Sequence, residues 1–405
     1  MRSSLQRAAF TLVELLVVVG ILLILIAMVL PAVQRVREVA NRMECADHLR
    51  RIGKGTLLFI EAHQKYFPNG GANAFNPENP TESFPRLLLS AGTPASGSKQ
   101  GWGWMYQILP YVEYESLWNL RRSPGTPNPI VDQMYLFDYP ADDEIRKTPI
   151  PLYFCPSRRS PQLVLALEFP WDFPHAACDY AGNAGPYSFI NNLDMSEHGQ
   201  LWGSALWLDK EFGLIVQGSS DPRSPDLGPQ GPGQLIMPGN RIHVRDVTDG
   251  LSNTLLASEK AYNADRWGIS QFGDRKSFCY GFGPSTCRTG ALPPVRDFHG
   301  TNAFGSSYPY SIDVPSGVDV AQDCFGSAHP YSMNALFADG SVRPIKYELP
   351  SDPQIRPVCN GALSQLNINP LPSPPNPPNS LSLTLFQRLC HRSDGGTVNL
   401  SLLDE

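Results

Sequence analysis

The sequence predicts an α+β fold, in which one long N-terminal helix packs on a β-rich, loop-rich antiparallel body. The helix is predicted by an apolar run over residues 10–33, followed by apolar residues at three- and four-residue spacing to about residue 60. The body is predicted by its content of Pro and Gly, which together make up about 18% of the chain against a usual value of roughly 12%. An Asp-Gly pair between two strand-like runs near residue 340 adds a β-hairpin.

The apolar run is long enough to cross a bilayer, which takes about 20 mostly apolar residues. Residues 15–30 carry no charge, and the run is interrupted only by Glu14 near its start and Pro31 near its end. An ionised carboxylate in hydrocarbon costs at least about 2.5–3.5 kcal/mol, so it normally has a partner. Glu14 therefore needs an opposite charge close to the start of the run.

Cleavage within the first residues would supply that charge. A secretory signal peptide has its small-residue cleavage site after the apolar core, but here Ala8 and Ala9 come before it. A cut after Ala9 leaves the helix on the mature chain and creates an ammonium on Phe10, one helical turn from Glu14. The same ammonium on a neighbouring subunit would serve equally well. The alternative is an uncleaved single-pass anchor, which creates no such ammonium.

Beyond Pro31 the chain has the pattern of an amphipathic helix. Gly53 and Gly55 weaken this helix or let another part of the chain approach closely, and Pro68 with the glycines that follow ends it. We expect the apolar face to pack on the rest of the chain. It consists of Val36, Val39, Met43, Ala46, Leu49, Ile52, Phe59 and Ile60.

The body is expected to contain short elements joined by loops. Short strands are predicted near residues 151–155, 177–185 and 254–259, and the aromatic-rich segment 101–118 is predicted to form core with a short helix near 110–120. Asp339-Gly340 predicts a two-residue hairpin turn with positive φ at both positions. Pro344 places the second strand of that hairpin at the edge of a sheet. Residues 370–380 predict a polyproline spacer, followed by a short helix at 385–389.

Charge and cysteine usage exclude some classes of function. The net charge of −6 argues against nucleic acid as a partner, because phosphate binding needs a basic face. The eight cysteines form no Cys-x-x-Cys motif, so a zinc ribbon or a thioredoxin-like site is unsupported. An even number in an exported chain permits disulfides, and Cys279 with Cys287 is the most plausible local pair. Cys45 is expected to be buried in the helix and reduced.

The segment FTLVELLVVVGILLILIAMVLPAV resembles the N-terminus of type IV prepilins and type II secretion pseudopilins. The resemblance implies that a membrane-bound prepilin peptidase cuts between Ala9 and Phe10 and that the new amino group of Phe10 is methylated. It implies that Glu14 guides subunit packing and that Pro31 marks the usual helix kink. Ala9 stands where this family usually has Gly. The body would then lie outside the inner membrane, in the periplasm or beyond.

The rest of the chain resembles the bacterial domain-of-unknown-function 1559 family. The C-terminal signature of that family is His, nine residues, then Asp-Gly, and here it is formed by His329, Asp339 and Gly340. The family supplies no reaction. The other blocks that carry the resemblance are Cys45, Leu49, Ile52-Gly53, Tyr66-Phe67-Pro68, Leu109-Pro110-Tyr111, Cys155-Pro156-Ser157-Arg158, Asp179-Tyr180-Ala181-Gly182-Asn183, Asp249-Gly250-Leu251-Ser252-Asn253-Thr254 and Glu259.

These inferences divide the chain into five parts. The first two are a leader and a long helix with its membrane segment at about 10–33. The β-rich body follows, and a Pro-rich spacer and a C-terminal tail complete the chain. The parts cover residues 1–9, 10–65, 66–369, 370–380 and 381–405.

Two sets of residues are candidates for a site. His329, Asp339 and Glu259 form a conceivable metal or acid–base set, but we expect His329 to pack beside the hairpin with its ring bonded to backbone, and Asp339 is explained by its turn. Oxygen ligands of the kind that calcium prefers are supplied by Asp246, Asp249, Asn253 and Glu259. Their spacing does not match an EF-hand, and no cofactor or metal is expected.

No His-Glu-x-x-His, P-loop or Gly-x-Ser-x-Gly motif is present, so we expect no enzyme. The leading hypothesis is a pseudopilin-like structural subunit of the cell envelope, which assembles with copies of itself or with other pilin-like subunits into a type II secretion or type IV pilus-like fibre. Its expected location is the inner membrane, single-pass, with the body extracytoplasmic. One alternative is a membrane-anchored protein that binds an envelope ligand such as carbohydrate and does not polymerise. Another is an anchored hydrolase.

Overall fold

The computed structural model describes most of the helix and the central part of the body. The leader, with Ala9 and Phe10, and the spacer at 370–380 lie outside the described residues. The described residues are 12–71, 100, 102–120, 140–165, 174–186, 213–216, 241–267, 274, 277–281, 283, 285–290, 294–299, 324–347, 385–395 and 398.

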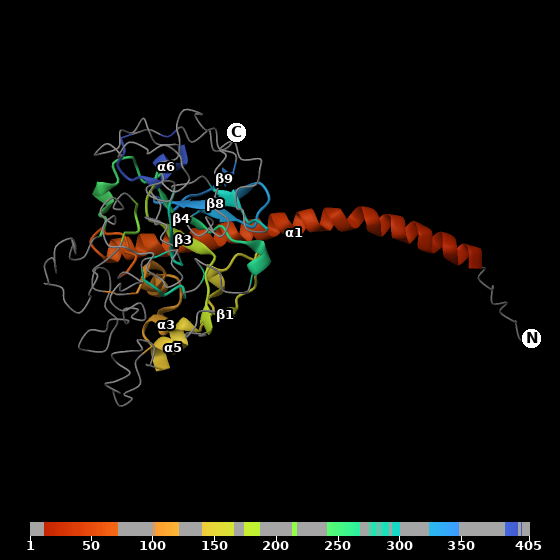
Figure 1. Cartoon of the computed structure of the whole chain (residues 1–405), viewed down its shortest axis with the longest axis horizontal. Helices are drawn as coiled ribbons and strands as arrows, with labels where there is room; N and C mark the ends of the chain where they lie inside the picture. The colour runs from red at the N-terminus through yellow and green to blue at the C-terminus, as the bar shows by residue number, and fades with distance from the viewer. Residues whose placement is uncertain are drawn as a thin grey trace, which may run out of the picture.

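One helix, α1 (Leu12–Ala62), is 51 residues long and therefore spans about 77 Å. Its N-terminal half projects from the body and its C-terminal half crosses it (Figure 1). Among the described helices, α1 is the one long and apolar enough to cross a membrane, and no residue of that apolar stretch is buried. The predicted helix is thus confirmed over its described part, and it continues through Pro31.

The second half of α1 belongs to the core of the body. Leu49, Ile52 and Phe59 are fully buried there, which confirms the apolar face from residue 49 onward. The expectation is wrong for Val36, Val39 and Met43, which are exposed. A methyl group on Gly53 would lie 2.7 Å from Cδ1 of Leu336, and one on Gly55 would overlap a side chain of the body. The two glycines therefore permit a close approach between the helix and the body, one of the two roles predicted for them.

The body is built on a five-stranded mixed sheet with the strand order β5-β3-β4-β8-β9. All neighbouring strands are antiparallel except β3 and β5, which run parallel. With α1 packed against β8, this arrangement confirms the α+β class and adds one parallel pairing to the expected antiparallel sheet. The strands are β3 (Tyr180–Asn183), β4 (Leu255–Glu259), β5 (Cys287–Arg288), β8 (Ser332–Phe337) and β9 (Val342–Lys346).

Smaller elements surround this sheet. Two further pairs of strands are β1 (Leu163–Leu165) with β2 (Pro174–Ala176), and β6 (Val295–Arg296) with β7 (Gly326–Ser327). The helices are α2 (Trp104–Gln107), η2 (Leu109–Tyr111), α3 (Glu115–Trp118), α5 (Pro140–Arg146), η3 (Pro151–Tyr153), η5 (Val244–Asp246), η6 (Ala264–Arg266) and α6 (Leu385–Cys390).

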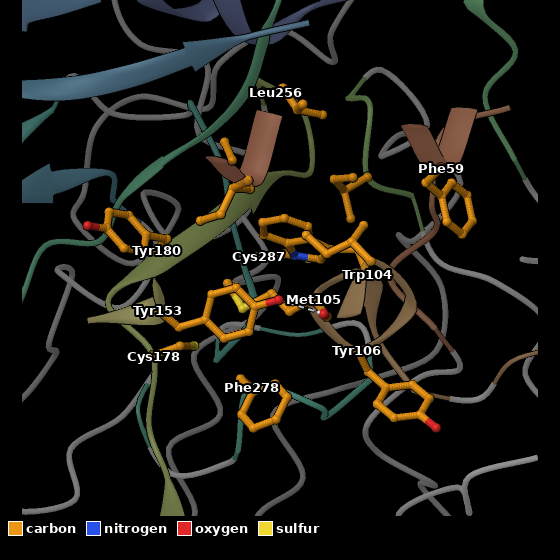
Figure 2. Close-up of a cluster of buried hydrophobic side chains, with 14 of the residues drawn as sticks. Phe59, Trp104, Met105, Tyr106, Tyr153, Cys178, Tyr180, Leu256, Phe278 and Cys287 are labelled. Carbon is orange, nitrogen blue, oxygen red and sulfur yellow. Dashed lines mark hydrogen bonds between the residues drawn. The ribbon is translucent and has the colours of Figure 1, made fainter. Parts of the chain in front are cut away.

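The aromatic-rich segment forms core, as predicted. Trp104 is fully buried and donates a hydrogen bond from Nε1 to the carbonyl of Thr286 at 2.9 Å. Tyr153 belongs to the same buried cluster (Figure 2), and its hydroxyl donates to the carbonyl of Met105 at 2.7 Å. The strand predicted near residues 151–155 is wrong: this segment is the 3₁₀-helix η3, whose first residue is Pro151. Proline at that position has a preset φ and no N–H to leave unsatisfied.

The predicted hairpin is present, but its turn is of another type. Gly340 donates to the carbonyl of Phe337 and has φ +85°, whereas Asp339 does not have a positive φ. Phe337 in turn donates to the carbonyl of Ser341 at 2.9 Å. This is a three-residue loop with a type I turn and a glycine bulge, not the expected two-residue turn. The strand that carries Pro344, β9, lies at the edge of the sheet, as predicted.

The predicted disulfide between Cys279 and Cys287 is not formed. The seven described cysteines are all buried free thiols. Cys287 is the first residue of β5, where it pairs with Gly182. Cys279 lies in a loop, and its carbonyl accepts a hydrogen bond from the N–H of Gly103. The two residues are thus held by different partners, although only seven residues separate them in the chain.

Candidate metal centre

Four segments that are distant in the sequence bring metal-ligating side chains together inside the body. Cys45 lies on α1, Cys155 lies just after η3, Glu259 is the last residue of β4, and His329 lies between β7 and β8. All four residues are fully buried. Their ligand atoms, two sulfurs, one carboxylate oxygen and one imidazole nitrogen, all lie within 4.8 Å of one another.

The individual distances show how closely the four groups face each other. The Sγ atoms of Cys45 and Cys155 are 2.9 Å apart. Nε2 of His329 lies 3.8 Å from Sγ of Cys155 and 3.1 Å from Oε1 of Glu259. His329 thus stands between the thiol pair and the carboxylate.

The carboxylate of Glu259 is held by a backbone hydrogen bond at one oxygen and by an ion pair with His329 at the other. The backbone N–H of Asn334 donates to Oε2 at 2.8 Å. Oε1 is buried and, among the described residues, has no partner in hydrogen-bonding geometry, although Nε2 of His329 is close to it. A buried carboxylate is costly unless its charge is compensated, and here the charged form of His329 compensates it.

The ring of His329 is oriented by a second carboxylate. Its Nδ1 lies 2.6 Å from Oε1 of Glu38, which belongs to α1, and the hydroxyl of Ser157 donates to the other oxygen of Glu38 at 2.8 Å. The expectation that this ring bonds to backbone is therefore wrong, because carboxylates face both ring nitrogens. The main chain of His329 does make hydrogen bonds, from its N–H to Ser327 and at its carbonyl from Tyr347.

A buried network of charges positions Cys155. The backbone N–H of Cys155 donates to Oδ2 of Asp179 at 2.9 Å. Asp179 is paired with two neighbours of Cys155, Arg158 at 3.3 Å and Arg159 at 2.6 Å. Arg158 also forms an ion pair with Asp297 at 2.8 Å. The turn that carries the thiol is therefore fixed by charged contacts that are out of reach of solvent.

Burial and proximity shift the ionisation of the four groups. Burial raises the pKa of the Cys45 thiol and raises that of Cys155 further. Burial opposes the charged form of His329 as well, but its contacts with Cys155 and Glu259 raise its pKa to about 11. Burial likewise opposes the charge on Glu259, but His329 outweighs it and the pKa of Glu259 is lowered. With no cation bound, the cluster holds two neutral thiols beside an imidazolium–carboxylate pair.

Such a cluster has few chemical possibilities. Because all four residues are fully buried, a substrate would not reach them without the body opening. Two thiols, one imidazole and one carboxylate are the ligand types of a four-coordinate zinc site. The two thiols alone are also able to form a disulfide if they are oxidised.

The calcium candidates do not converge. Asp249 accepts hydrogen bonds from the backbone N–H groups of Asp394 and Gly395, at 2.7 and 3.0 Å. Asp246 caps η5 by accepting from the N–H of His243, and the side chain of Asn253 donates to the carbonyl of Asp249. In the described part of the chain, their carboxylates join no group of potential metal ligands with Glu259.

The remaining predicted site residues have clear positions. Asp339 and Gly340 form the hairpin turn, where Oδ1 of Asp339 accepts from the N–H of Ser341 at 2.9 Å. Asp339 therefore does not join His329 and Glu259, which do come together. Glu14 lies in the first turn of α1, and Pro31 lies within the exposed half of that helix.

Sequence reasoning missed two residues of the cluster, Cys45 and Cys155, and also Glu38, which contacts it. The two cysteines lie in blocks of the same resemblance that contains Glu259 and His329, and all four are of metal-ligating types. Grouping those blocks by side-chain chemistry would have named these four among the candidate ligands, but not shown that they meet. Glu38 has no such signal, because it resembles any other charged residue on an amphipathic helix.

Fold and cluster together define a class of protein. It is an α+β protein with one long helix. The helix is apolar and exposed over its first half and packs on a mixed sheet over its second half, where a buried group of metal-ligating side chains lies. A family model described as "Protein of unknown function (DUF1559)" matches residues 34–352, and the chain belongs to this family. The match contains the whole cluster and Glu38. Comparisons with curated proteins and with solved structures find no match.

Proposed function

We propose that this chain is a pseudopilin-like structural subunit of the bacterial cell envelope. In this proposal, the first half of α1 holds the chain in the inner membrane and the body lies on the extracytoplasmic side. A prepilin peptidase cuts before Phe10. The subunit then assembles with copies of itself or with other pilin-like subunits into a type II secretion or type IV pilus-like fibre.

The observation that carries the proposal is the exposed apolar half of α1. Its side chains are exposed from Leu12 to Leu30 with few exceptions, while one face of the second half of the same helix is buried in the body. A continuous apolar surface of that length needs a lipid or protein environment. A membrane supplies this environment before assembly, and a bundle of equivalent helices supplies it within a fibre.

Glu14 gives the proposal its specificity. It lies in the first turn of α1 and follows Phe10 by four residues in the sequence, and cleavage would release the amino group of Phe10. An ammonium from the same or a neighbouring subunit offsets the cost of a carboxylate at membrane depth. This pairing would set the axial position of each subunit against the next.

The proposal assigns no reaction to the chain. The polar cluster at residues 45, 155, 259 and 329 is buried, which supports a structural role better than a catalytic one. The alternative function is an anchored ligand-binding protein that does not polymerise. It would use the same membrane helix but would undergo neither cleavage nor assembly.

The mature N-terminus tests the proposal directly. The chain would be purified from the cell envelope and its N-terminal peptide identified by mass spectrometry. We expect a chain that begins at Phe10 and carries a methyl group on its amino nitrogen. A chain that still begins at Met1 would refute processing and leave a tethered domain.

A further inference from the structure

We propose that the buried cluster is a structural metal site for a divalent transition-metal ion, with Zn²⁺ the best fit. The ion would join α1 to the turn after η3, to the end of β4 and to the segment before β8. The four ligands are Cys45, Cys155, Glu259 and His329. This inference does not depend on cleavage or on fibre assembly.

The types of ligand select the ion. Zn²⁺ is bound in proteins by Cys, His and Asp or Glu, almost always with four ligands at structural sites. Two thiolates disfavour Mg²⁺ and Ca²⁺, which prefer oxygen ligands. Because the protein supplies all four ligands, no coordination position is left for water or substrate, as is typical of structural rather than catalytic zinc.

The distances fit a four-coordinate site after a small adjustment. With zinc–ligand bonds of about 2.0–2.3 Å, the ligand atoms of a tetrahedron lie about 3.3–3.8 Å apart. The nitrogen–sulfur distance of 3.8 Å and the nitrogen–oxygen distance of 3.1 Å are close to this range. The two sulfurs, at 2.9 Å, would have to separate by about 1 Å, which small side-chain rotations achieve.

Two further observations point to a bound cation. The first is Oε1 of Glu259, a buried carboxylate oxygen that faces Nε2 of His329 at 3.1 Å, so that a cation in place of the Nε2 proton would be bound by both groups. The second is the contact of 2.6 Å between Glu38 and Nδ1 of His329. A carboxylate on the far nitrogen of a histidine fixes the ring and its tautomer, and it is the usual support of a metal-bound histidine.

Binding would replace protons with the ion. Each thiol loses its proton and Nε2 of His329 loses its own, while Nδ1 keeps the proton that it shares with Glu38. The ion then faces two thiolates and one carboxylate, and the buried guanidinium of Arg158 offsets part of the remaining negative charge.

The main rival is a disulfide between Cys45 and Cys155. The sulfurs are closer than ordinary non-bonded contact but well beyond the bond length of about 2.05 Å. A disulfide would use two of the four groups and would not account for the convergence of His329 and Glu259 on the same point, whereas a metal ion uses all four. The geometry therefore favours the metal.

The experiment measures metal on the full-length chain, purified in detergent without chelator. Elemental analysis is expected to give about one zinc per chain. Cys155→Ala and the near-isosteric Glu259→Gln are expected to lose it. Cys287→Ala, which alters a buried free thiol outside the cluster, is expected to keep it. Circular dichroism on each variant establishes that loss of metal is not loss of fold.

A second measurement tests the role of Glu38. In competition with a chromophoric chelator, Glu38→Gln is expected to bind zinc about 10–100-fold more weakly than the parent chain. Glu44→Gln, which changes an exposed carboxylate on the same helix, should bind as the parent does. Equal affinity for Glu38→Gln and the parent would contradict the assigned arrangement.

Three outcomes would overturn the proposal. The first is a purified parent chain without stoichiometric metal that takes up none when Zn²⁺ is added after reduction. The second is equal metal content in Cys155→Ala and the parent. The third is a peptide in which Cys45 and Cys155 are joined by a disulfide, found by mass spectrometry of chain isolated from the envelope.

Discussion

Glu38 and His329 lie 291 residues apart in the sequence, yet Oε1 of the first is 2.6 Å from Nδ1 of the second. The other oxygen of Glu38 accepts a hydrogen bond from Ser157. A single carboxylate on α1 thus contacts both the turn after η3 and the segment before β8. Glu38 marks the point along the helix where contacts with the body begin. It follows Leu30, the last residue of the uncharged apolar stretch, by eight residues.

This boundary predicts where the chain can be shortened. A chain that begins at Gln34 keeps every buried residue of α1 and should fold as a soluble protein. A chain that begins at Tyr66 loses Leu49, Ile52, Phe59 and Ile60 from the core. At about 1.5–3 kcal/mol for each side chain, that loss is about 6–12 kcal/mol, comparable to the whole stability of a typical domain.

The comparison is made by expressing both chains and recording near-ultraviolet circular dichroism and size-exclusion profiles. The chain from Gln34 should be monodisperse with a fixed tertiary signal, and the chain from Tyr66 should aggregate or lack that signal. A stable, well-ordered chain from Tyr66 would contradict the role given to α1 in the core.

Arg158 should be among the most sensitive charged residues. Its side chain is fully buried between Asp179 and Asp297, and it also donates to the carbonyl of Lys260 at 2.6 Å. Arg158→Met leaves the buried carboxylate of Asp297 without its cation and leaves Asp179 with Arg159 alone, so the unfolding free energy should fall by about 3–5 kcal/mol.

The control is Arg51→Met, because Arg51 forms an exposed pair with Glu113 at 3.3 Å. Its removal should change the unfolding free energy by less than about 1 kcal/mol. Urea denaturation followed by tryptophan fluorescence compares the two variants. Equal effects would mean that the buried network contributes no more than a surface pair.

Acid should loosen the docking of the C-terminal segment. Burial, opposed in part by Asp249, lowers the pKa of His391 to about 4, and its Nδ1 accepts a hydrogen bond from the N–H of Ser393 at 3.0 Å. Since the unfolded chain has a histidine pKa of about 6.5, the unfolded state binds the proton more readily between pH 6.5 and 4. The contribution of His391 to the unfolding free energy is fully present above pH 6.5. The unfolding free energy should fall by up to about 3 kcal/mol as the pH drops to 4.

His391→Asn tests this cause. Asparagine keeps an acceptor for the N–H of Ser393 but does not titrate in this range. The unfolding free energy of the variant should vary less between pH 6.5 and 4 than that of the parent. An identical pH profile in the two chains would assign the acid sensitivity to other groups.

Periodicity in the sequence was sufficient to predict the long helix, because a run of apolar residues and a three- and four-residue repeat are local signals. The hairpin at residue 340 was predicted for the same reason. Its turn type was wrong, since Asp-Gly also suits a type I turn in which only Gly340 needs positive φ. The strand expected near residue 151 failed because the fixed φ of Pro151 favours a helical turn.

The candidate site was only partly predictable, because it depends on contacts between distant segments. His329 and Glu259 were both considered, but no local pattern indicates that Cys45 on the helix and Cys155 after η3 meet them. Asp249 was considered as a calcium ligand, yet its carboxylate binds the backbone at residues 394 and 395. Asp and Asn side chains in a turn accept hydrogen bonds from backbone N–H groups as readily as they bind a metal ion. Sequence alone does not distinguish these two uses.

Assembly should depend on Glu14 and not on negative charge elsewhere along α1. Glu14→Leu removes the carboxylate that would pair with the ammonium of Phe10, and it also makes the apolar stretch more hydrophobic. The variant should therefore enter the membrane as well as the parent does but fail to form fibres or cross-linkable oligomers. Glu61→Leu, which changes an exposed carboxylate near the other end of the same helix, should assemble normally. Membrane fractionation and cross-linking in the native host measure both steps, and normal assembly of Glu14→Leu would favour the anchored, non-polymerising alternative.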